Sequence, residues 1–417
     1  MTRTLRVAAL QLEAHDRADF ETAERSLRSA VFDAARGHDL LVLPEATLPA
    51  YVLGDDRVDD EAVARAIDRL RDIAKETTCV IVAGAAIRRA GKLYNSAVVI
   101  DADGTIAGSA EKIFLWHFDR KWFAPGERIA PVATRAGRLG VLICADGRMP
   151  GIARTLADLG AELLVMPTAW VTSGRDPDAL ENIQADLLAR VRAFENGVPF
   201  VAANKCGVEM KMVAYCGKSQ IVDGTGEVVA IAAEHEPGTI DASIVIGAQS
   251  PRRASIPAIT QRSPESGAIR VAFSLDPIDD VARRLDILDA QEFIGPQNSE
   301  RVDAEVAFDP GTLPRYRAAG YRRIVLDAKR SHPWLERVAR ARAAELRVFL
   351  IVFDRERDRA YAIDPDGAIV AGTYDGLRIA SVTMDFRRTN ETAVAPGTDV
   401  ELGLAAVASI ADAEERV

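Results

Sequence analysis

Short apolar runs alternate with segments of helical periodicity through the first 250 or so residues of this 417-residue chain. Short apolar runs are typical of buried strands, and apolar residues at three- and four-residue spacing are typical of helices. Their alternation favours an α/β fold in which helices cover the sheets. The expected strands are Leu5–Leu12, Leu40–Leu43, Val80–Ile87, Ser96–Asp101, Leu139–Cys144, Leu163–Met166, Phe200–Asn204 and Ser219–Val222. The expected helices are Phe20–Arg36, Glu61–Glu76, Gly151–Leu159 and Leu180–Asn196.

Two segments have the composition of tight turns between antiparallel strands. They are Asp101-Ala-Asp-Gly104 and Asp223-Gly-Thr-Gly226, and each ends in a glycine. Asp-Gly sequences of this kind favour hairpins. We therefore expect mixed sheets rather than purely parallel ones.

A change of composition divides the chain. The segment Gln249–Gly267 lacks periodicity and is rich in Ser, Pro and Arg, which is typical of a linker. A length of 417 residues also exceeds the usual size of one domain. We expect a first domain over residues 1–265 and a smaller C-terminal α/β domain over residues 266–417.

The C-terminal region contains an echo of the first domain. Three segments of the first domain are similar in sequence to three later segments, which follow in the same order and at similar spacing. The similar pairs are Leu159–Val165 and Ala319–Val325, Ala189–Glu195 and Ala339–Glu345, and Asp223–Val229 and Asp364–Val370. Helix–strand–hairpin runs in an Ala- and Arg-rich chain also produce such similarity by chance. We interpret the echo as a degenerate partial second copy. No cysteine follows Cys216, so this copy has no thiol chemistry, and its role is that of a structural part, a lid or an interface.

Charge and cysteine content exclude several classes of partner. The net charge of −10 argues against nucleic acid or an anionic membrane as the main partner. The apolar run Val7–Leu10 is too short for a signal peptide, and no run is long enough to cross a bilayer. The four cysteines are not at metal-binding spacing, and neither are the five histidines. We expect a cytoplasmic protein with reduced thiols and no metal.

Three reactive residues lie at or near the ends of predicted strands, where α/β proteins place their sites. Glu45 follows the apolar run through Leu43-Pro44, Lys112 opens an aromatic-rich stretch, and Cys144 ends a third strand. A helix is expected to begin near Pro150. Nearby backbone amides and this helix N-terminus would then help to stabilise a Cys144 thiolate.

Each of these residues has an ordinary structural interpretation when it is taken alone. A glutamate at a strand end is usually a solvated loop residue, and a lysine near aromatic residues is usually a surface side chain. A cysteine after an apolar run is usually core. Only their combination points to chemistry.

The ordered motifs resemble those of the nitrilase superfamily, the carbon–nitrogen hydrolases. The family's glutamate follows a pattern like Leu43-Pro-Glu45, its lysine opens a segment that ends in aromatic-x-Pro-Gly126, and its cysteine lies in a pattern like Gly140-Val-Leu-Ile-Cys144-x-Asp146-x-Arg148-x-Pro150. Family-like pieces also follow in order. They are Gly160–Pro167 with Ala169-Trp170, Arg192–Asn196, Ala203-Asn204 and Gly217–Ser219. The resemblance covers almost all of the first domain.

The resemblance implies an αββα sandwich and a Glu45–Lys112–Cys144 triad. Glu45 is expected to act as general base, and Cys144 as the nucleophile that forms a thioester. Lys112 and the backbone amide of Ala145 are expected to stabilise the oxyanion. No cofactor is expected. The implied partners are a small-molecule amide, carbamoyl or nitrile substrate and further copies of the chain, as a dimer or a higher homo-oligomer.

Departures from the family pattern refine these expectations. Where many amidase-type members carry a second glutamate, this chain has Asp119, which we interpret as a possible auxiliary residue. His117 and Trp170 are candidate pocket residues, although a histidine at the edge of the core or a core tryptophan is as ordinary. The loops Asp56–Asp60 and Thr172–Pro177 are candidate pocket walls.

Three functions stay open at this point. Nitrile-hydrolysing members tend to have Trp-Glu after the cysteine, but this chain has Ala145-Asp146, which favours the amidase and carbamoylase branch. The first hypothesis is therefore hydrolysis of a small carboxamide or N-carbamoyl compound to an acid and ammonia or an amine. The alternatives are a nitrilase and, from another class, a catalytically inactive binding or regulatory protein. The intact Glu45, Lys112 and Cys144 set speaks against the last.

Overall fold

The chain forms two compact units in its computed structural model, which describes residues 2–55, 57–174, 179–247, 251–277, 289–296, 300–395, 398–401, 403–405, 407 and 410. Unit 1 consists of residues 1–251, 395–398 and 402–417, and unit 2 consists of residues 252–394 and 399–401. The change from one unit to the other at residues 251 and 252 lies inside the segment Gln249–Gly267. The C-terminal residues belong to unit 1, which the sequence did not indicate.

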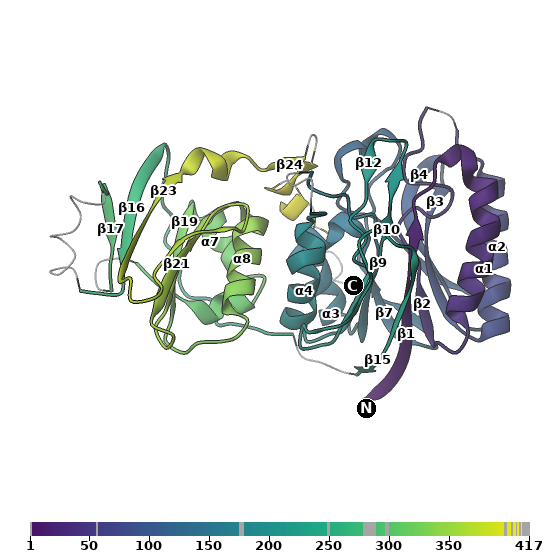
Figure 1. Ribbon diagram of the computed structural model, residues 1–417, viewed down its shortest axis with the longest axis horizontal. Helices are drawn as coiled ribbons and strands as arrows, with labels where there is room; N and C mark the ends of the chain where they lie inside the picture. Colours follow the sequence, from purple (N-terminus) through teal and green to yellow (C-terminus); the bar gives the residue numbers. More distant parts are fainter. Residues whose placement is uncertain are drawn as a thin grey trace. The chain divides into compact units, whose positions relative to one another are not determined.

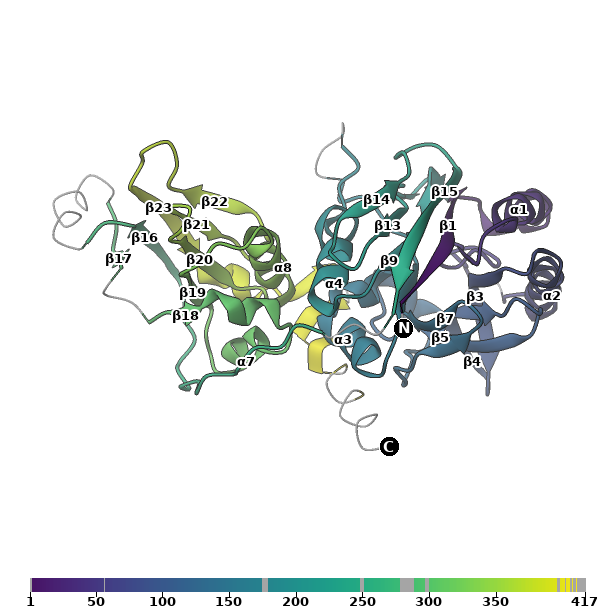
Figure 2. The ribbon, with the colours of Figure 1, turned by 90° about the horizontal axis from the view of Figure 1, so that it is seen from below.

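Unit 1 has four layers, with two sheets between two pairs of helices (Figure 1, Figure 2). The first sheet has the order β10-β1-β2-β3-β4-β5, with β15 also paired to β1. The second has the order β14-β13-β9-β8-β7-β6. Helices α1 and α2 cover the first sheet, and α3 and α4 cover the second. This arrangement confirms the expected α/β class with mixed sheets.

The helices of unit 1 are α1 (Phe20–Ala35), α2 (Asp60–Thr77), α3 (Pro150–Asp158) and α4 (Ala189–Asn196), with 3-10 turns η2 (His117–Lys121) and η3 (Cys144–Arg148) and the π-turn η4 (Gln184–Leu188). Its longer strands are β1 (Arg3–Glu13), β2 (Leu40–Val42), β3 (Val80–Arg89), β4 (Lys92–Ile100), β5 (Ile106–Glu111), β7 (Gly137–Val141), β8 (Leu163–Pro167), β9 (Phe200–Ala203), β13 (Gln220–Val222), β14 (Val228–Ile231) and β15 (Gly238–Ile246). Its remaining strands are β6 (Val132–Thr134), β10 (Lys205–Cys206), β11 (Val208–Glu209) and β12 (Val213–Ala214), and β6 is as long as β2 and β13. No helix within the described ranges is both long and apolar enough to cross a membrane.

Apolar side chains on the inner faces of α1 and α2 explain why these helices pack on the first sheet. Phe20, Leu27 and Val31 of α1 are buried, and they belong to one core cluster with Val63 and Leu70 of α2 and the residues of β2 and β3. Helix α2 begins at Asp59, whose side chain accepts a hydrogen bond from the Ala62 amide at 2.9 Å. The core therefore fixes the strands whose ends carry the candidate site.

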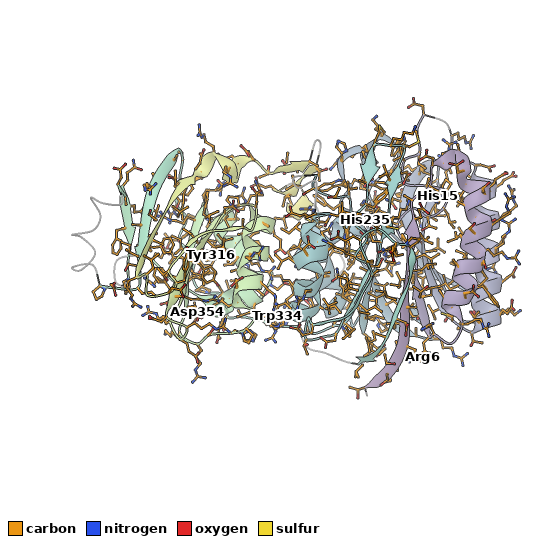
Figure 3. The ribbon with its side chains drawn as sticks, viewed as in Figure 1. Arg6, His15, His235, Tyr316, Trp334 and Asp354 are labelled. Atoms are coloured by element: carbon orange, nitrogen blue, oxygen red, sulfur yellow. The ribbon has the colours of Figure 1, made fainter. Side chains whose placement is uncertain are left out.

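Unit 2 is a smaller α/β assembly with its own core. Its strands are β16 (Ala268–Ser274), β17 (Glu292–Ile294), β18 (Val302–Asp303), β19 (Arg323–Ala328), β20 (Phe349–Asp354), β21 (Arg359–Ile363), β22 (Ile369–Gly372) and β23 (Ile379–Asp385). Its helices are α7 (Leu313–Ala318) and α8 (Leu335–Leu346), with 3-10 turns η5 (Ala304–Phe308) and η6 (Phe386–Asn390). Tyr316, Trp334 and Asp354 are all buried here (Figure 3). The short strands β24 (Ala393–Ala395) and β25 (Thr398–Asp399) form a separate pair.

The central sheets of the two units have the same topology and register. In unit 1, the strands β7, β8 and β9 are parallel, and β13 and β14 extend the sheet in antiparallel pairing. In unit 2, the strands β18, β19 and β20 are parallel, and β21 and β22 extend the sheet in the same way. Both antiparallel pairs shift register at their hairpin. The hairpin aspartates Asp223 and Asp364 each accept from the glycine amide three residues later at 2.9 Å.

A buried ion pair also recurs in the two units. In α4, the Arg192 guanidinium pairs with Glu195 at 2.7 Å, and its Nε donates to the Gly147 carbonyl of η3 at 2.9 Å. In α8, Arg342 pairs with Glu345 at 2.6 Å, and its Nε donates to the Ala307 carbonyl of η5 at 3.0 Å. In both units, an arginine of such a buried ion pair thus links a helix to the turn that follows the first parallel strand.

Two sequence expectations about individual elements were wrong. The strand expected over Leu139–Cys144 ends at Val141, and it cannot include Cys144 because this residue adopts a φ of +45° that no strand permits. The helix expected over Leu180–Asn196 is shorter, because α4 begins only at Ala189 and the π-turn η4 directly precedes it. Strand β15 was missed, although its residues alternate between exposed and less exposed side chains.

Candidate active site

Glu45 lies three residues beyond β2, with its side chain fully buried. Its backbone amide donates to the Thr168 carbonyl at 3.2 Å. A Cβ added at Gly84 would lie 2.4 Å from the Pro44 carbonyl and 2.6 Å from the Glu45 Cα, so the glycine lets β3 pass directly beneath this segment. Oε1 of Glu45 accepts hydrogen bonds from Asn95 and from Lys112, both at 2.7 Å. Both donors therefore hold the same oxygen of the carboxylate.

Lys112 follows β5, and its side chain is also fully buried. Its Nζ lies 2.7 Å from Oε1 of Glu45 and 2.7 Å from Oδ2 of Asp119, and 5.7 Å from the centre of the Tyr51 ring. Burial lowers the pKa of Lys112, but Asp119, Glu45 and Cys144 together raise it well above its ordinary value. Two carboxylates thus keep this buried amine charged.

Cys144 is the first residue of η3 and is 5% exposed. Its positive φ turns the chain sharply after β7, a conformation that costs energy in a residue with a Cβ. Asp146 holds this turn, because Oδ1 accepts from the amides of Ile113 and Phe114 at 3.1 and 2.8 Å and Oδ2 accepts from the Ile143 amide at 3.0 Å. The same carboxylate therefore links the lysine segment to the cysteine turn.

The surroundings of Cys144 raise the pKa of its thiol. Burial is the main cause that raises its pKa to about 12, and Glu45 raises it further, whereas Lys112, the Thr168 side chain and the Ala169 backbone lower it. This direction favours the neutral thiol and differs from the expectation of a thiolate stabilised by amides and a helix N-terminus, because desolvation outweighs these groups. Both Glu45 and Lys112 are near enough to act electrostatically on the sulfur.

Asp119 has the contact with the lysine that the sequence register suggested. It is fully buried in η2, and Oδ2 accepts from the Trp116 amide at 2.8 Å in addition to pairing with Lys112.

The three pocket candidates occupy different positions. Ala145 is buried next to Cys144 in η3, and Trp170 is buried beyond β8, where its backbone amide donates to Asn204 Oδ1 at 2.7 Å. His117 is half-buried and packs its ring edge-on against Phe118, with the ring centres 5.0 Å apart. Its backbone amide donates to the Thr398 hydroxyl of the returning C-terminal segment. His117 therefore connects this segment to η2.

Several residues of the site were not identified from the sequence. Asn95 of β4 binds Glu45, Thr168 lies beside the thiol, and Tyr51 lies against Lys112. The available signal for Asn95 was its polar side chain directly before the expected strand Ser96–Asp101, since buried polar side chains need partners. Thr168 and Tyr51 had no comparable signal.

A second buried network lies next to Tyr51. Glu209 accepts from the Tyr215 hydroxyl at 2.6 Å and from the Val52 amide at 2.6 Å, and Lys205 lies 3.4 Å from the same carboxylate. Tyr215 packs edge-on against Tyr51, with the ring centres 6.4 Å apart. This network fixes the segment that follows Glu45.

The described residues contain no group of three or more His, Cys, Asp and Glu side chains that could hold a metal ion. His15 and His235, for example, come from separate segments (Figure 3). Of the loops expected to wall the pocket, Asp56 and residues 175–177 lie outside the described residues.

Several known proteins are similar to part of this chain. An (R)-stereoselective amidase of Pseudomonas sp. is 32% identical over 228 residues, which cover 54% of this chain and 80% of that protein. An N-carbamoylputrescine amidase of Solanum lycopersicum is 32% identical over 263 residues, covering 57% and 85%. A probable nitrilase of Schizosaccharomyces pombe is 35% identical over 161 residues, and the match spans only 56% of that protein.

A solved structure supports the fold assignment and carries chemistry at a cysteine. The amidase of Nesterenkonia sp. AN1 matches with a TM-score of 0.51 and 27% identity, over 57% of this chain and 89% of that one. Its variant carries the acetamide moiety of fluoroacetamide covalently at the active-site cysteine. Residues 6–251 match the carbon-nitrogen hydrolase family over more than half of the chain. With this match and the fold of unit 1, the chain belongs to the carbon-nitrogen hydrolase family of enzymes.

Proposed function

We propose that unit 1 hydrolyses a small carboxamide or an N-carbamoyl compound through a thioester on Cys144. The observation that carries the proposal is the contact of Lys112 with Glu45 at 2.7 Å, both fully buried, beside a thiol whose pKa responds to both. An amide carbon is a poor electrophile, and a buried sulfur with a base beside it is the kind of nucleophile that such a carbon needs.

The first half of the reaction forms the thioester. Glu45 takes the thiol proton while Sγ of Cys144 attacks the carbonyl carbon, so a thiolate need not exist in the resting enzyme. The carbonyl oxygen becomes an oxyanion, which the charged Lys112 and the backbone amide of Ala145 stabilise. The C–N bond then breaks, and the departing nitrogen takes the proton from Glu45 and leaves as ammonia or an amine.

The second half hydrolyses the thioester. Glu45 takes a proton from water, the resulting hydroxide attacks the thioester carbon, and the C–S bond breaks. The sulfur regains a proton and the acid leaves. The net reaction is amide plus water to acid plus ammonia or an amine. Asp119 keeps Lys112 charged and Asn95 orients Glu45, so both act on the reacting groups through another residue.

We further infer that unit 2 is a truncated, degenerate copy of the second half of unit 1. The equal strand order, the equal register and the recurring buried Arg–Glu pair support this inference. Ala304 begins η5 as Cys144 begins η3, so unit 2 contributes no thiol. Association into a homo-oligomer remains our expectation, and sedimentation of the full chain measures it.

The experiment is a substrate panel assayed for released ammonia. It contains small carboxamides, N-carbamoyl amino acids and nitriles, with the Cys144→Ala protein and the Cys79→Ala protein as a matched pair. Cys79 is also buried, but it lies in the core beside β3. We expect turnover of amides or carbamoyl compounds that Cys144→Ala abolishes and Cys79→Ala retains. Turnover of nitriles but not of the matching amides would contradict the proposal in favour of a nitrilase.

A further inference from the structure

A pocket of about 780 Å³ lies in unit 2 at the sheet edge where unit 1 carries Cys144. Strand register defines this equivalence. In unit 2, Asp303 of β18 pairs with Asp327 of β19, and the turn η5 follows at Ala304. In unit 1, Val141 of β7 pairs with Val165 of β8, and the turn η3 follows at Cys144. Arg342 and Arg192 donate to the fourth residue of each turn, which fixes the alignment independently.

The residues that line this pocket occupy positions equivalent to those of the catalytic site. Ala304 stands in the position of Cys144, and Ala328 ends β19 just as Thr168 follows β8 beside the thiol. Arg330 lies two residues beyond Ala328, as Trp170 lies two residues beyond Thr168. The nucleophile is lost, but the cavity at this edge remains.

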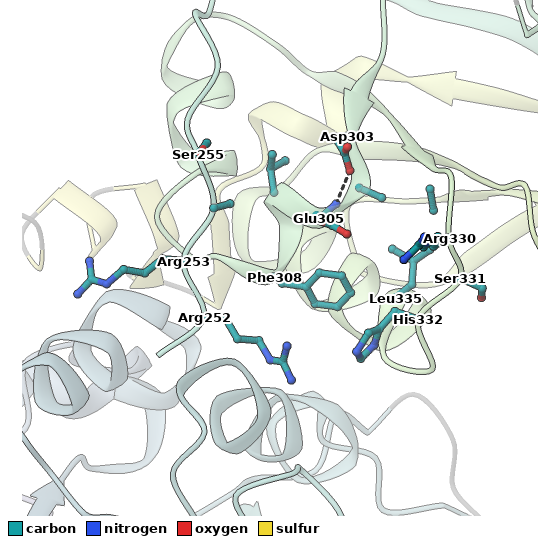
Figure 4. Close-up of a pocket in the computed structure, with 14 residues that line it drawn as sticks. Arg252, Arg253, Ser255, Asp303, Glu305, Phe308, Arg330, Ser331, His332 and Leu335 are labelled. Atoms are coloured by element: carbon teal, nitrogen blue, oxygen red, sulfur yellow. Dashed lines mark hydrogen bonds between the residues drawn. The ribbon is translucent and has the colours of Figure 1, made fainter. Parts of the chain in front are cut away.

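The pocket carries charges of both signs around an aromatic ring. Arg252, Arg253 and Arg330 line it together with the acids Asp303 and Glu305. Phe308 packs its ring against His332, with the ring centres 4.9 Å apart. Figure 4 shows Arg252 and His332 on the same side of Phe308, whereas Arg253 points away from it.

Arg252 and Glu305 both act electrostatically on the imidazole of His332. Burial lowers the pKa of His332, Arg252 lowers it further and Glu305 raises it, and all three residues line the pocket. Glu305 and Arg330 are exposed, and neither forms an ion pair with another residue that the structure describes. Asp303 accepts from the Glu305 amide at 3.0 Å and thereby holds the turn. The pocket lining thus combines guanidinium groups, carboxylates and an aromatic ring.

We propose that this pocket binds a small zwitterion with an apolar body, of the α-amino acid class, and performs no chemistry on it. Arg252 and Arg330 receive the carboxylate, since guanidinium groups match its geometry. Glu305 receives the ammonium group, and Phe308 packs against the apolar body. A phosphate-like anion fits less well, because the two carboxylates repel it.

The test is a calorimetric titration of the full chain with three probes that share one body and differ only in charge. L-phenylalanine carries both charges, 3-phenylpropanoate carries only the carboxylate, and 2-phenylethylammonium carries only the ammonium group. We expect phenylalanine to bind most tightly, 3-phenylpropanoate roughly tenfold more weakly because one charged hydrogen bond is lost, and 2-phenylethylammonium not measurably.

Variants locate the binding. Arg252→Ala and Arg330→Ala should each weaken phenylalanine binding roughly tenfold or more, and Glu305→Gln should weaken binding of phenylalanine but not of 3-phenylpropanoate. Lys329→Ala is the matched control, because it removes an exposed charge next to Arg330 and does not line the pocket. Equal binding of all three probes, no saturable binding of phenylalanine, or binding that Arg252→Ala and Arg330→Ala leave unchanged would overturn the proposal. Loss of binding in Cys144→Ala alone would place the ligand in unit 1 and overturn it as well.

Discussion

The amine of Lys112 and the carboxylate of Glu45 form an ion pair of 2.7 Å with both side chains completely buried. A buried pair of this kind is expensive to desolvate and is weak evidence for stability. Its cost is understandable if the pair serves the chemistry of the adjacent Cys144, where a fixed cation and a base are both required. Buried and perturbed ionisable groups cluster at functional sites for this reason.

The pH dependence of Cys144 alkylation follows from its raised pKa. Burial and Glu45 raise this pKa to about 12, so the thiolate fraction is small at neutral pH and rises as the pH rises. The rate of iodoacetamide labelling at Cys144 should therefore increase about tenfold per pH unit between roughly pH 7 and 9. Peptide mass spectrometry at each pH measures it. A rate that levels off below about pH 8 would contradict the raised pKa.

Asp119→Asn should lower kcat with little effect on folding. The change keeps a similar shape but removes one of the two carboxylates that hold Lys112 charged. A charged hydrogen bond contributes about 1.5–3 kcal/mol, which corresponds to a fall in kcat of roughly 10- to 100-fold. Asp103→Asn, which alters an exposed hairpin carboxylate, is the control. Unchanged kcat in Asp119→Asn would show that this residue does not position the lysine.

Gly84→Ala should damage the site from a position that carries no functional side chain. The added Cβ would lie 2.4 Å from both the Ala46 nitrogen and the Pro44 carbonyl oxygen, so the segment bearing Glu45 must move. We expect a loss of about 1–3 kcal/mol in stability and a large loss of activity. Gly238→Ala on β15 is the matched control, because no atom lies within 4 Å of its added Cβ. Thermal denaturation and ammonia release measure both effects; wild-type activity in Gly84→Ala would contradict the close packing.

Arg342→Met tests the stability of unit 2 separately from catalysis. The substitution leaves the Glu345 carboxylate buried without the guanidinium that lies 2.6 Å away. Breaking a buried pair in this way typically costs about 3–5 kcal/mol. We expect a lower transition temperature for unit 2, and retained turnover per folded molecule at low temperature because no residue of unit 2 belongs to the proposed triad. The double variant Arg342→Met/Glu345→Leu should recover most of the lost stability, and failure to do so would contradict the ion-pair explanation.

The contact between Glu45 and Lys112 could be anticipated because both residues stand in the ordered motifs that resemble one family. Glu45 and Lys112 lie just beyond strands of unit 1, and Asp119 has the contact that its register suggested. The resting state of Cys144 could not be predicted, because it depends on how completely the fold excludes water from the sulfur. Asn95 and Thr168 sit inside or directly after buried strands, where polar residues carry no periodic signal. The membership of the C-terminal residues in unit 1 depends on tertiary packing that no local pattern records.

The most direct test of the thioester mechanism is mass spectrometry of the acid-quenched enzyme during turnover of an amide from the substrate panel. The mechanism predicts an acyl group of the substrate's mass on the peptide that contains Cys144, with accumulation before steady state and none in Cys144→Ala. Full turnover with no acyl group on Cys144, or full turnover by Cys144→Ala, would contradict it.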